Sequence, residues 1–288
     1  MNLKLQNIFL LSSLILFLFS SCSNRPRFLK LIEKGSKTEI KQALQDSANI
    51  NIRDKSGRTP LMIAAFNRTD PEITKLLLDN GANINARNNF DETALMAAAA
   101  RNSNPKIAKI LIQAGADVDA KDSKGQTALM WAAQHNKNEE VTQILIENGA
   151  DINAKDENNE TALLSAIMGN HKKNAKIIIN NGANVNISNK SEETPLMFAA
   201  SRFEDTDIIR DLLQNGAKVN SQTKEGRTAL MAAAKYNPNP AVLKLLLQND
   251  ANLNLTDKNG NNVLDYIKEN EQLKGSKIHQ KLKRSLAD

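Results

Sequence analysis

A seven-residue segment recurs six times along this chain, and its spacing constrains the fold more than any other feature. The copies are "TPLMIAA", "TALMAAA", "TALMWAA", "TALLSAI", "TPLMFAA" and "TALMAAA", which begin at Thr59, Thr93, Thr127, Thr161, Thr194 and Thr228. A second series, from "NGANIN" at Asn80 to "NDANLN" at Asn249, keeps the same spacing. Successive copies lie 33 or 34 residues apart. A fixed period of this size indicates stacked supersecondary units, each of which contacts its neighbours.

The residues of each unit predict two short helices. A turn such as "DKSG" over 54–57 comes first, with residues suited to turns and to positive φ. The following threonine can cap a first helix through its hydroxyl, and that helix is rich in alanine. In the second unit Pro105 stands where a second helix would begin, and an apolar stripe runs from Ile107 to Ile112. Gly115 is then suited to the left-handed conformation that ends a helix.

The chain therefore resembles an ankyrin-repeat protein. The T-P/A-L openings, the I/V-x-x-L-L-L second helices and the G-A-D/N-x-N exits carry the resemblance. Six full units are predicted, over residues 54–87, 88–121, 122–155, 156–188, 189–222 and 223–256. The resemblance covers nearly all of residues 28–288 and implies an all-α solenoid of helix-turn-helix repeats with β-hairpin loops.

The sequence departs from the usual pattern in two ways. The ends are atypical, which predicts a capping helix pair over 28–53 and a capping repeat over 257–288. Ser47 and Asp250 replace the exit glycine. The family's usual histidine after T-P-L is also absent, and a row of apolar side chains is expected in its place: Met62, Met96, Met130, Leu164, Met197 and Met231.

The first residues of the chain read as an export signal. Twelve uncharged residues, Ile8 to Phe19, follow Lys4 and precede the small residues "SSC". A membrane-spanning helix needs about 20 residues, so the run is short for one. This layout predicts a signal peptide over 1–21, with a buried helix as the alternative, and leaves 22–27 as a short tether.

Cys22 is the one cysteine in the chain, and it directly follows this segment. The sequence "FSSC" resembles a bacterial lipobox, although Phe19 departs from the commoner aliphatic residue. The resemblance implies that Cys22 carries lipid, such as palmitate, and becomes the mature N-terminus. The protein would then be exported and anchored to the cell membrane or outer membrane, facing the periplasm or the cell surface. The alternative is an incidental cysteine.

No catalytic, metal or cofactor site is expected. His135, His171 and His279 are far apart in sequence, and no metalloprotease or nucleophile-elbow motif is present. The Asp/Asn pairs in "GADVDAKD" invite a calcium site, but such residues more often hydrogen-bond backbone in turns. A net charge of +6 and an aromatic content of 4% do not favour specific nucleic-acid binding. Helix packing is the preferred role for Trp131, with a ligand platform as the alternative.

Binding to another protein remains as the function that the resemblance implies. Alignment of the units predicts a concave binding strip at the hairpin tips and first-helix ends: Lys55, Arg58, Phe66, Phe90, Arg101, His135, Arg202, Arg227 and Tyr236. We call these nine residues the predicted binding strip. The expected protein is a monomeric scaffold of the cell envelope.

Two alternatives remain. The chain could protect or mature an exported enzyme, as the resemblance to envelope ankyrin proteins allows. It could instead bind anionic surfaces such as nucleic acid or lipid headgroups. Four C-terminal cations could contact such a surface, or could simply be the solvent-exposed face of the capping repeat: Lys277, Lys281, Lys283 and Arg284.

Overall fold

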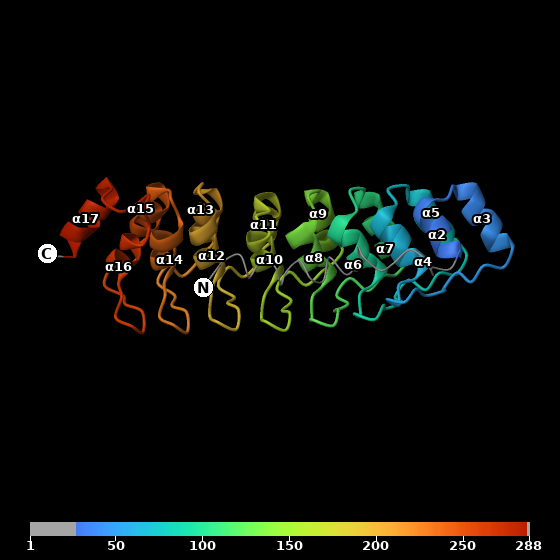
Figure 1. Cartoon of the computed structure of the whole chain (residues 1–288), viewed down its shortest axis with the longest axis horizontal. Helices are drawn as coiled ribbons and strands as arrows, with labels where there is room; N and C mark the ends of the chain where they lie inside the picture. Colours follow the sequence, from blue (N-terminus) through green and yellow to red (C-terminus); the bar gives the residue numbers. More distant parts are fainter. Residues whose placement is uncertain (1–26, 287–288) are drawn as a thin grey trace.

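Pairs of antiparallel helices follow one another in a single row over residues 27–286, the part of the chain that this computed structural model describes (Figure 1). The first helices of the pairs are α2 (Arg27–Lys34), α4 (Pro60–Asn67), α6 (Ala94–Arg101), α8 (Ala128–His135), α10 (Ala162–Met168), α12 (Pro195–Arg202), α14 (Ala229–Tyr236) and α16 (Val263–Lys268). The second helices are α3 (Lys37–Gln45), α5 (Pro71–Asp79), α7 (Pro105–Gln113), α9 (Glu139–Glu147), α11 (Lys172–Asn180), α13 (Asp207–Gln214), α15 (Pro240–Gln248) and α17 (Lys277–Ser285). The predicted all-α solenoid is confirmed.

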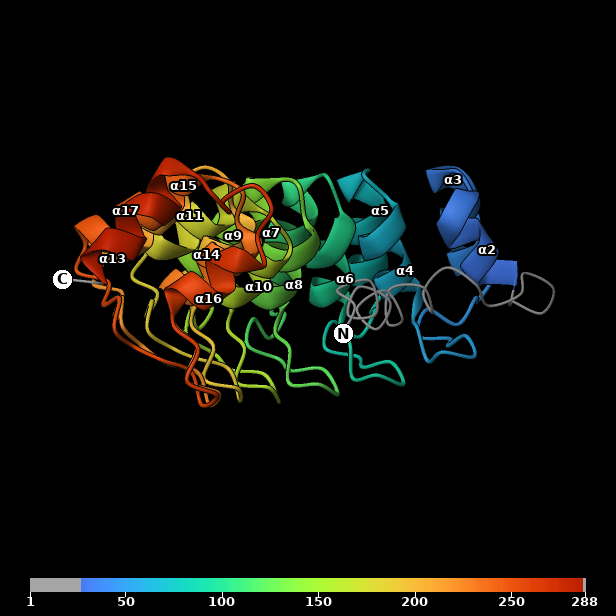
Figure 2. The same cartoon turned by 60° about the vertical axis from the view of Figure 1, so that its left-hand side comes forward.

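Long loops connect each pair to the next and project together from one side of the row (Figures 1 and 2). Each is a hairpin in its hydrogen bonding: in the first repeat, the amides of Asp54 and Gly57 donate to the carbonyls of Arg58 and Asp54, at 3.1 and 2.9 Å. None of these loops forms a regular strand within the described residues. The first helices therefore lie between a layer of hairpins and a layer of second helices.

The recurrent threonine starts the first helix of every full repeat. Its Oγ1 accepts a hydrogen bond from the amide three residues later, for example from Met62 to Thr59 at 3.4 Å. In two repeats the methionine sulfur also accepts a hydrogen bond from the backbone of the capping threonine: Thr59 N–H donates to Met62, and Thr194 N–H donates to Met197. The thioether thus occupies the position in which a capping box has a polar side chain.

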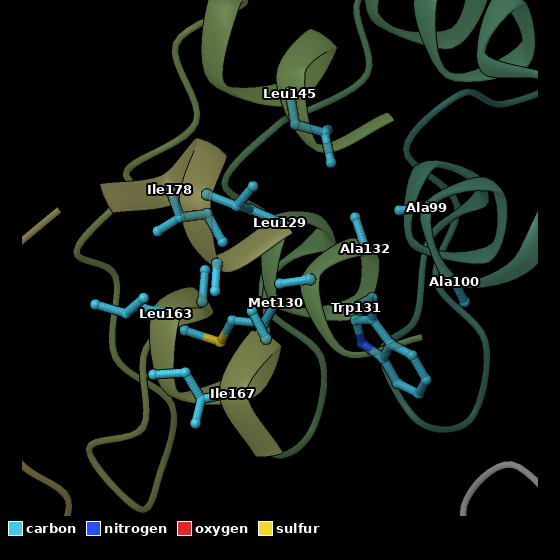
Figure 3. Close-up of a cluster of buried hydrophobic side chains, with 14 of the residues drawn as sticks. Ala99, Ala100, Leu129, Met130, Trp131, Ala132, Leu145, Leu163, Ile167 and Ile178 are labelled. Atoms are coloured by element: carbon cyan, nitrogen blue, oxygen red, sulfur yellow. The ribbon is translucent and has the colours of Figure 1, made fainter. Parts of the chain in front are cut away.

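The predicted methionine row is part of the continuous core. Met62, Met96, Met130, Met197 and Met231 are 1–5% exposed, and Leu164 is fully buried. Figure 3 shows Met130 beside Leu163 and Ile167 of the next repeat, with Leu129 and Ile178 above them. Each such side chain contributes about 1.5–3 kcal/mol by burial. Alanines on the first helices let neighbouring backbones approach closely.

Backbone conformation at the helix exits also follows the sequence expectation. The φ angle lies between 84° and 89° at all five exit glycines: Gly81, Gly115, Gly149, Gly182 and Gly216. The two replacements keep the same left-handed conformation, with φ of 68° at Ser47 and 64° at Asp250. The exit therefore requires this conformation even where no glycine supplies it.

The N-terminal predictions lie outside the described residues. These are the signal peptide over 1–21, the lipidated Cys22 and most of the tether over 22–27. Among residues 27–286, no helix combines the length and apolarity that crossing a membrane requires.

Candidate protein-binding surface

A buried or half-buried polar side chain fixes the shape of each hairpin. Asp54, Asn88, Asp122, Asp156, Asn189 and Asp257 each accept hydrogen bonds at Oδ1 from the amides two and four residues ahead. Thr223 does the same through its hydroxyl. The loop tips therefore keep one geometry while their outward side chains differ.

Neighbouring hairpins are also bonded to each other. Ser123 N–H donates to the Phe90 carbonyl at 2.9 Å, and Lys190 N–H donates to the Asn158 carbonyl at 2.9 Å. Equivalent bonds occur at the other junctions between full repeats. The tips thus form a continuous ribbed surface rather than independent loops.

Most of the predicted binding strip lies at the surface. Phe90 and Tyr236 are 40% and 46% exposed, and no other large apolar side chain in residues 27–286 is exposed. The side chains of Lys55, Arg101, Arg202 and Arg227 are exposed as well, whereas Phe66 and His135 are half-buried. Exposed aromatic rings and arginines are the residue types that anchor protein interfaces.

The prediction that Arg58 belongs to the exposed binding strip is wrong. It is 5% exposed, and its Nη2 lies 2.7 Å from Asp54 Oδ2 in a buried ion pair. Asp54 begins the hairpin and Arg58 ends it, so the pair closes the loop from inside. The structure gives Arg58 a role in the framework, not the exposed position that alignment predicted.

Trp131 packs in the core, as the sequence interpretation preferred. It is 8% exposed, and its Nε1–H donates to Asp122 Oδ2 at 3.1 Å. Its ring centroid lies 5.4 Å from that of His135. Burial, and then the charges of Arg101 and His171, lower the pKa of His135 to about 4. His135 is therefore neutral at pH 7 and offers no positive charge to a partner.

Buried and half-buried acidic residues line the inner ends of the hairpins. Burial raises the pKa of Glu92 and of Asp122, and hydrogen bonds from Asn88 and from the Gln126 and Lys124 amides partly oppose it. At Glu160, no hydrogen bond or positive charge within residues 27–286 opposes the effect of burial on the pKa. Burial, Asp156 and Glu193 raise its pKa to about 7.

A ladder of buried asparagines joins the repeats, and the sequence analysis missed it. The Nδ2 atom of Asn102 donates to the Ala65 and Arg68 carbonyls, at 2.7 and 2.8 Å. That of Asn136 donates to the Ala99 and Asn102 carbonyls, at 2.9 and 3.2 Å. Asn174, Asn237 and Asn270 make the same kind of bond to the preceding repeat. Asparagines at nearly the same place in several repeats, Asn102, Asn136, Asn237 and Asn270, were the available signal.

The side-chain oxygens of the Asp and Asn residues at the helix exits accept hydrogen bonds from backbone amides. Asp119 Oδ1 accepts from the Asp151 amide of the next repeat at 2.8 Å, and Asp117 Oδ1 accepts from the Asp119 amide at 3.1 Å. The part of the chain that the structure describes brings no three His, Cys, Asp or Glu side chains together in a way that could hold a metal ion.

Comparison with known families agrees with this architecture. A family model described as ankyrin repeats in three copies matches residues 28–88, 67–156, 138–223 and 196–278. The matches overlap and together span residues 28–278, which includes the whole ribbed surface. No curated protein matches the chain.

Proposed function

Because the chain belongs to the ankyrin-repeat family, we propose that it is a membrane-anchored scaffold that docks a partner protein on its hairpin tips and first-helix ends. Ankyrin repeats are typically interaction modules without enzymatic activity. The partner engages the exposed members of the predicted binding strip, above all Phe90 and Tyr236.

The observation that supports this proposal is that the side chains that hold the fold recur in every repeat, whereas the outward-facing side chains of the hairpins differ from repeat to repeat. The capping threonines, the hairpin Asp and Asn residues and the ladder asparagines recur with the period, and their side chains cap helices or bond backbone groups. The outward positions differ between repeats. The same hairpin position holds Ser56 in the first repeat, Phe90 in the second and Lys124 in the third. A surface that varies on a constant frame is suited to a specific partner rather than to the fold's own stability.

The anchor is the second part of the proposal. Cys22 follows a short apolar segment and small residues, the arrangement that lipid attachment requires. We place the protein in the bacterial cell envelope, held to a membrane by that lipid. With Ser23 to Arg27 as the tether, at most about 17 Å of chain separates the lipid from α2.

The first prediction tests the docking surface at Phe90. A photo-crosslinking amino acid at position 90 in the lipidated protein should capture the partner in its own cells. The same amino acid at Lys109, on the exposed outer side of α7, should not. With the partner purified, Phe90→Ser should weaken binding by about 1–2 kcal/mol or more, because an anchoring ring is lost.

The stability of the same variant separates binding from folding. Phe90→Ser should change the free energy of unfolding by less than about 0.5 kcal/mol, as at other surface sites. Lys109→Ser is the matched control and should leave both quantities unchanged. Lost stability with unchanged affinity would show that Phe90 supports packing and would remove the best support for the docking surface.

A specific observation favours one alternative, an anionic-surface binder. Helix α17 contains no acidic residue, and Lys277, Lys281, Lys283 and Arg284 are exposed without an ion pair to any acid in residues 27–286. Retention on anionic vesicles that falls steeply with salt would support this function. Retention that salt barely changes, or none at all, would count against it.

A further inference from the structure

The dipeptide Asn-Gly, the asparagine sequence most prone to spontaneous deamidation, occurs five times in this chain. Asn259 lies in the last hairpin, and the other four asparagines lie at helix exits: Asn80, Asn148, Asn181 and Asn215. The following glycine has no side chain to hinder attack by its own amide nitrogen on the asparagine side chain. All five asparagines are exposed to solvent. Sequence and exposure therefore give the five sites a similar reactivity, and any difference must come from the fold.

The attacking nitrogen is held in the same way at all five sites. The φ angle of the glycine lies between 80° and 86° at each of them. Its amide donates to the carbonyl three residues before it, at 3.0 Å: from Gly81 to Leu78, Gly149 to Ile146, Gly182 to Ile179, Gly216 to Leu213 and Gly260 to Asp257. The nucleophile therefore does not distinguish the last hairpin from the helix exits.

The asparagine side chain is where the sites differ. At each helix exit its Nδ2 donates to the carbonyl four residues before it, at 2.8 Å. This bond holds the side-chain amide back along its own helix, away from the glycine that follows. In the described part of the chain, the Asn259 side chain makes no hydrogen bond; only its backbone N–H is engaged, by Asp257 Oδ1 at 2.9 Å. Asn259 can therefore turn towards Gly260 without breaking a side-chain bond.

The peptide group between Asn259 and Gly260 is also less restrained than its counterparts in earlier hairpins. There, the carbonyl at this position accepts from the next hairpin, as the Glu225 carbonyl does from the Lys258 amide at 3.0 Å. The hairpin of Asn259 is the last in the row, directly before α16 (Figure 1). Over residues 27–286 the Asn259 carbonyl accepts no hydrogen bond. Ring closure requires this peptide group to rotate, and no neighbouring hairpin opposes that rotation.

We propose that Asn259 is a site of spontaneous deamidation, whereas the asparagines at the helix exits are held unreactive. The Gly260 nitrogen loses its proton to solvent base and forms a bond to Asn259 Cγ. The Cγ–Nδ2 bond then breaks, and Nδ2 takes up a proton and leaves as ammonia. Water opens the resulting succinimide ring. Attack of water at Cγ gives aspartate, and attack at the main-chain carbonyl carbon gives isoaspartate.

The products alter the last hairpin. Both place a new negative charge at the hairpin position that Glu225 occupies in the preceding repeat. Isoaspartate also adds a methylene group to the main chain of a loop that Asp257 holds closed. Asp257 Oδ1 accepts from the Asn259 and Asn261 amides at 2.9 and 2.8 Å, and its Oδ2 accepts from the Tyr266 hydroxyl at 2.7 Å. Chains with a loosened last hairpin therefore accumulate as the protein ages. This inference stands apart from the proposed function, because it concerns the chemistry of the chain alone.

Incubation of the purified full-length protein in mildly alkaline buffer tests the site. Peptide mapping by mass spectrometry, with separation of aspartate from isoaspartate, measures the reaction at all five asparagines. Asn259 should react about fivefold or more faster than any exit asparagine, because each exit side chain must first release its hydrogen bond. A rate at Asn259 equal to or below the rates at the exits overturns the proposal.

The same incubation in denaturant separates fold from sequence. All five sites should then react at similar rates, and a preference for Asn259 that persists there overturns the structural argument. Asn259→Gln should abolish the hairpin product and leave the exits unchanged; a product that remains in that peptide assigns the reaction to another residue. In the isoaspartate fraction, the Asn261 amide should exchange hydrogen faster than in unreacted protein. Unchanged protection there overturns the loosening of the hairpin.

Discussion

At the scale of single residues, the helix exit is a place where this fold requires a left-handed backbone conformation. Gly149 has a φ of 86°, and a Cβ atom added there would meet no heavy atom within 4 Å. A side chain at this position is therefore disfavoured by backbone conformation alone. Asp250 and Ser47 accept the same conformation, as short polar residues do more readily than branched ones.

The second prediction follows from that exit. Gly149→Val should lower the free energy of unfolding by about 1–3 kcal/mol, because a β-branched residue is strained at positive φ. Gly149→Asn is the control and should lose clearly less. Urea unfolding of both variants gives the comparison. Equal midpoints for wild type and Gly149→Val would contradict the exit geometry.

The third prediction concerns acid stability at His135. Its folded pKa of about 4 lies below the ordinary value of 6.5, so the unfolded chain binds the proton more readily. The stabilisation from keeping His135 neutral is present above pH 6.5 and is lost as the pH falls towards 4. Relative to His135→Gln, wild type should lose about 1–3 kcal/mol over that range. Parallel pH profiles of unfolding for the two proteins would refute the burial argument.

At the scale of the elements, the helices were predictable and the links between them were not. Thr59 and its equivalents mark helix starts because capping is local in sequence, and Pro105 marks one because its φ is preset. The Asn136 amide instead bonds carbonyls 34 and 37 residues away. Only the packed loops reveal that contact, although the periodic asparagines were visible. Arg58 was misplaced for the same reason, since its pairing with Asp54 depends on the folded hairpin.

The fourth prediction tests one of these links. Asn136→Ala should lower the free energy of unfolding by about 2–4 kcal/mol, because it removes buried hydrogen bonds and leaves the Ala99 and Asn102 carbonyls without them. Asn148→Ala is the matched control, since that exposed amide bonds only Ile144 of its own helix. Thermal or urea unfolding measures both. A loss no larger than that of Asn148→Ala would show that the ladder adds little stability.

At the scale of the whole molecule, the row of repeats is extended and its two ends differ. The N-terminal pair α2 and α3 lies at one end of the row, and the basic helix α17 lies at the other end (Figure 1).

The fifth prediction tests the proposed lipid anchor. Cys22→Ser should leave the signal uncleaved at this site and abolish the acyl-modified N-terminus, because the lipid is attached through the thiol. Mass spectrometry of the N-terminus and fractionation of membranes give the readout. A wild-type chain with unmodified Cys22, or one that starts at another residue, would disprove lipid anchoring.

The asparagine ladder has a consequence for how such a chain changes over generations. Each amide bonds main-chain carbonyls, which every amino acid possesses, so a repeat places little demand on the identity of the repeat beneath it. A gene segment encoding one repeat can therefore be duplicated, deleted or exchanged without compensating substitutions next door. Between the fourth and fifth repeats the position equivalent to Asn237 holds Phe203, which is 1% exposed, so an apolar ring must find a matching surface there. Length variation by whole repeats should accordingly be tolerated best on either side of that junction and least across it.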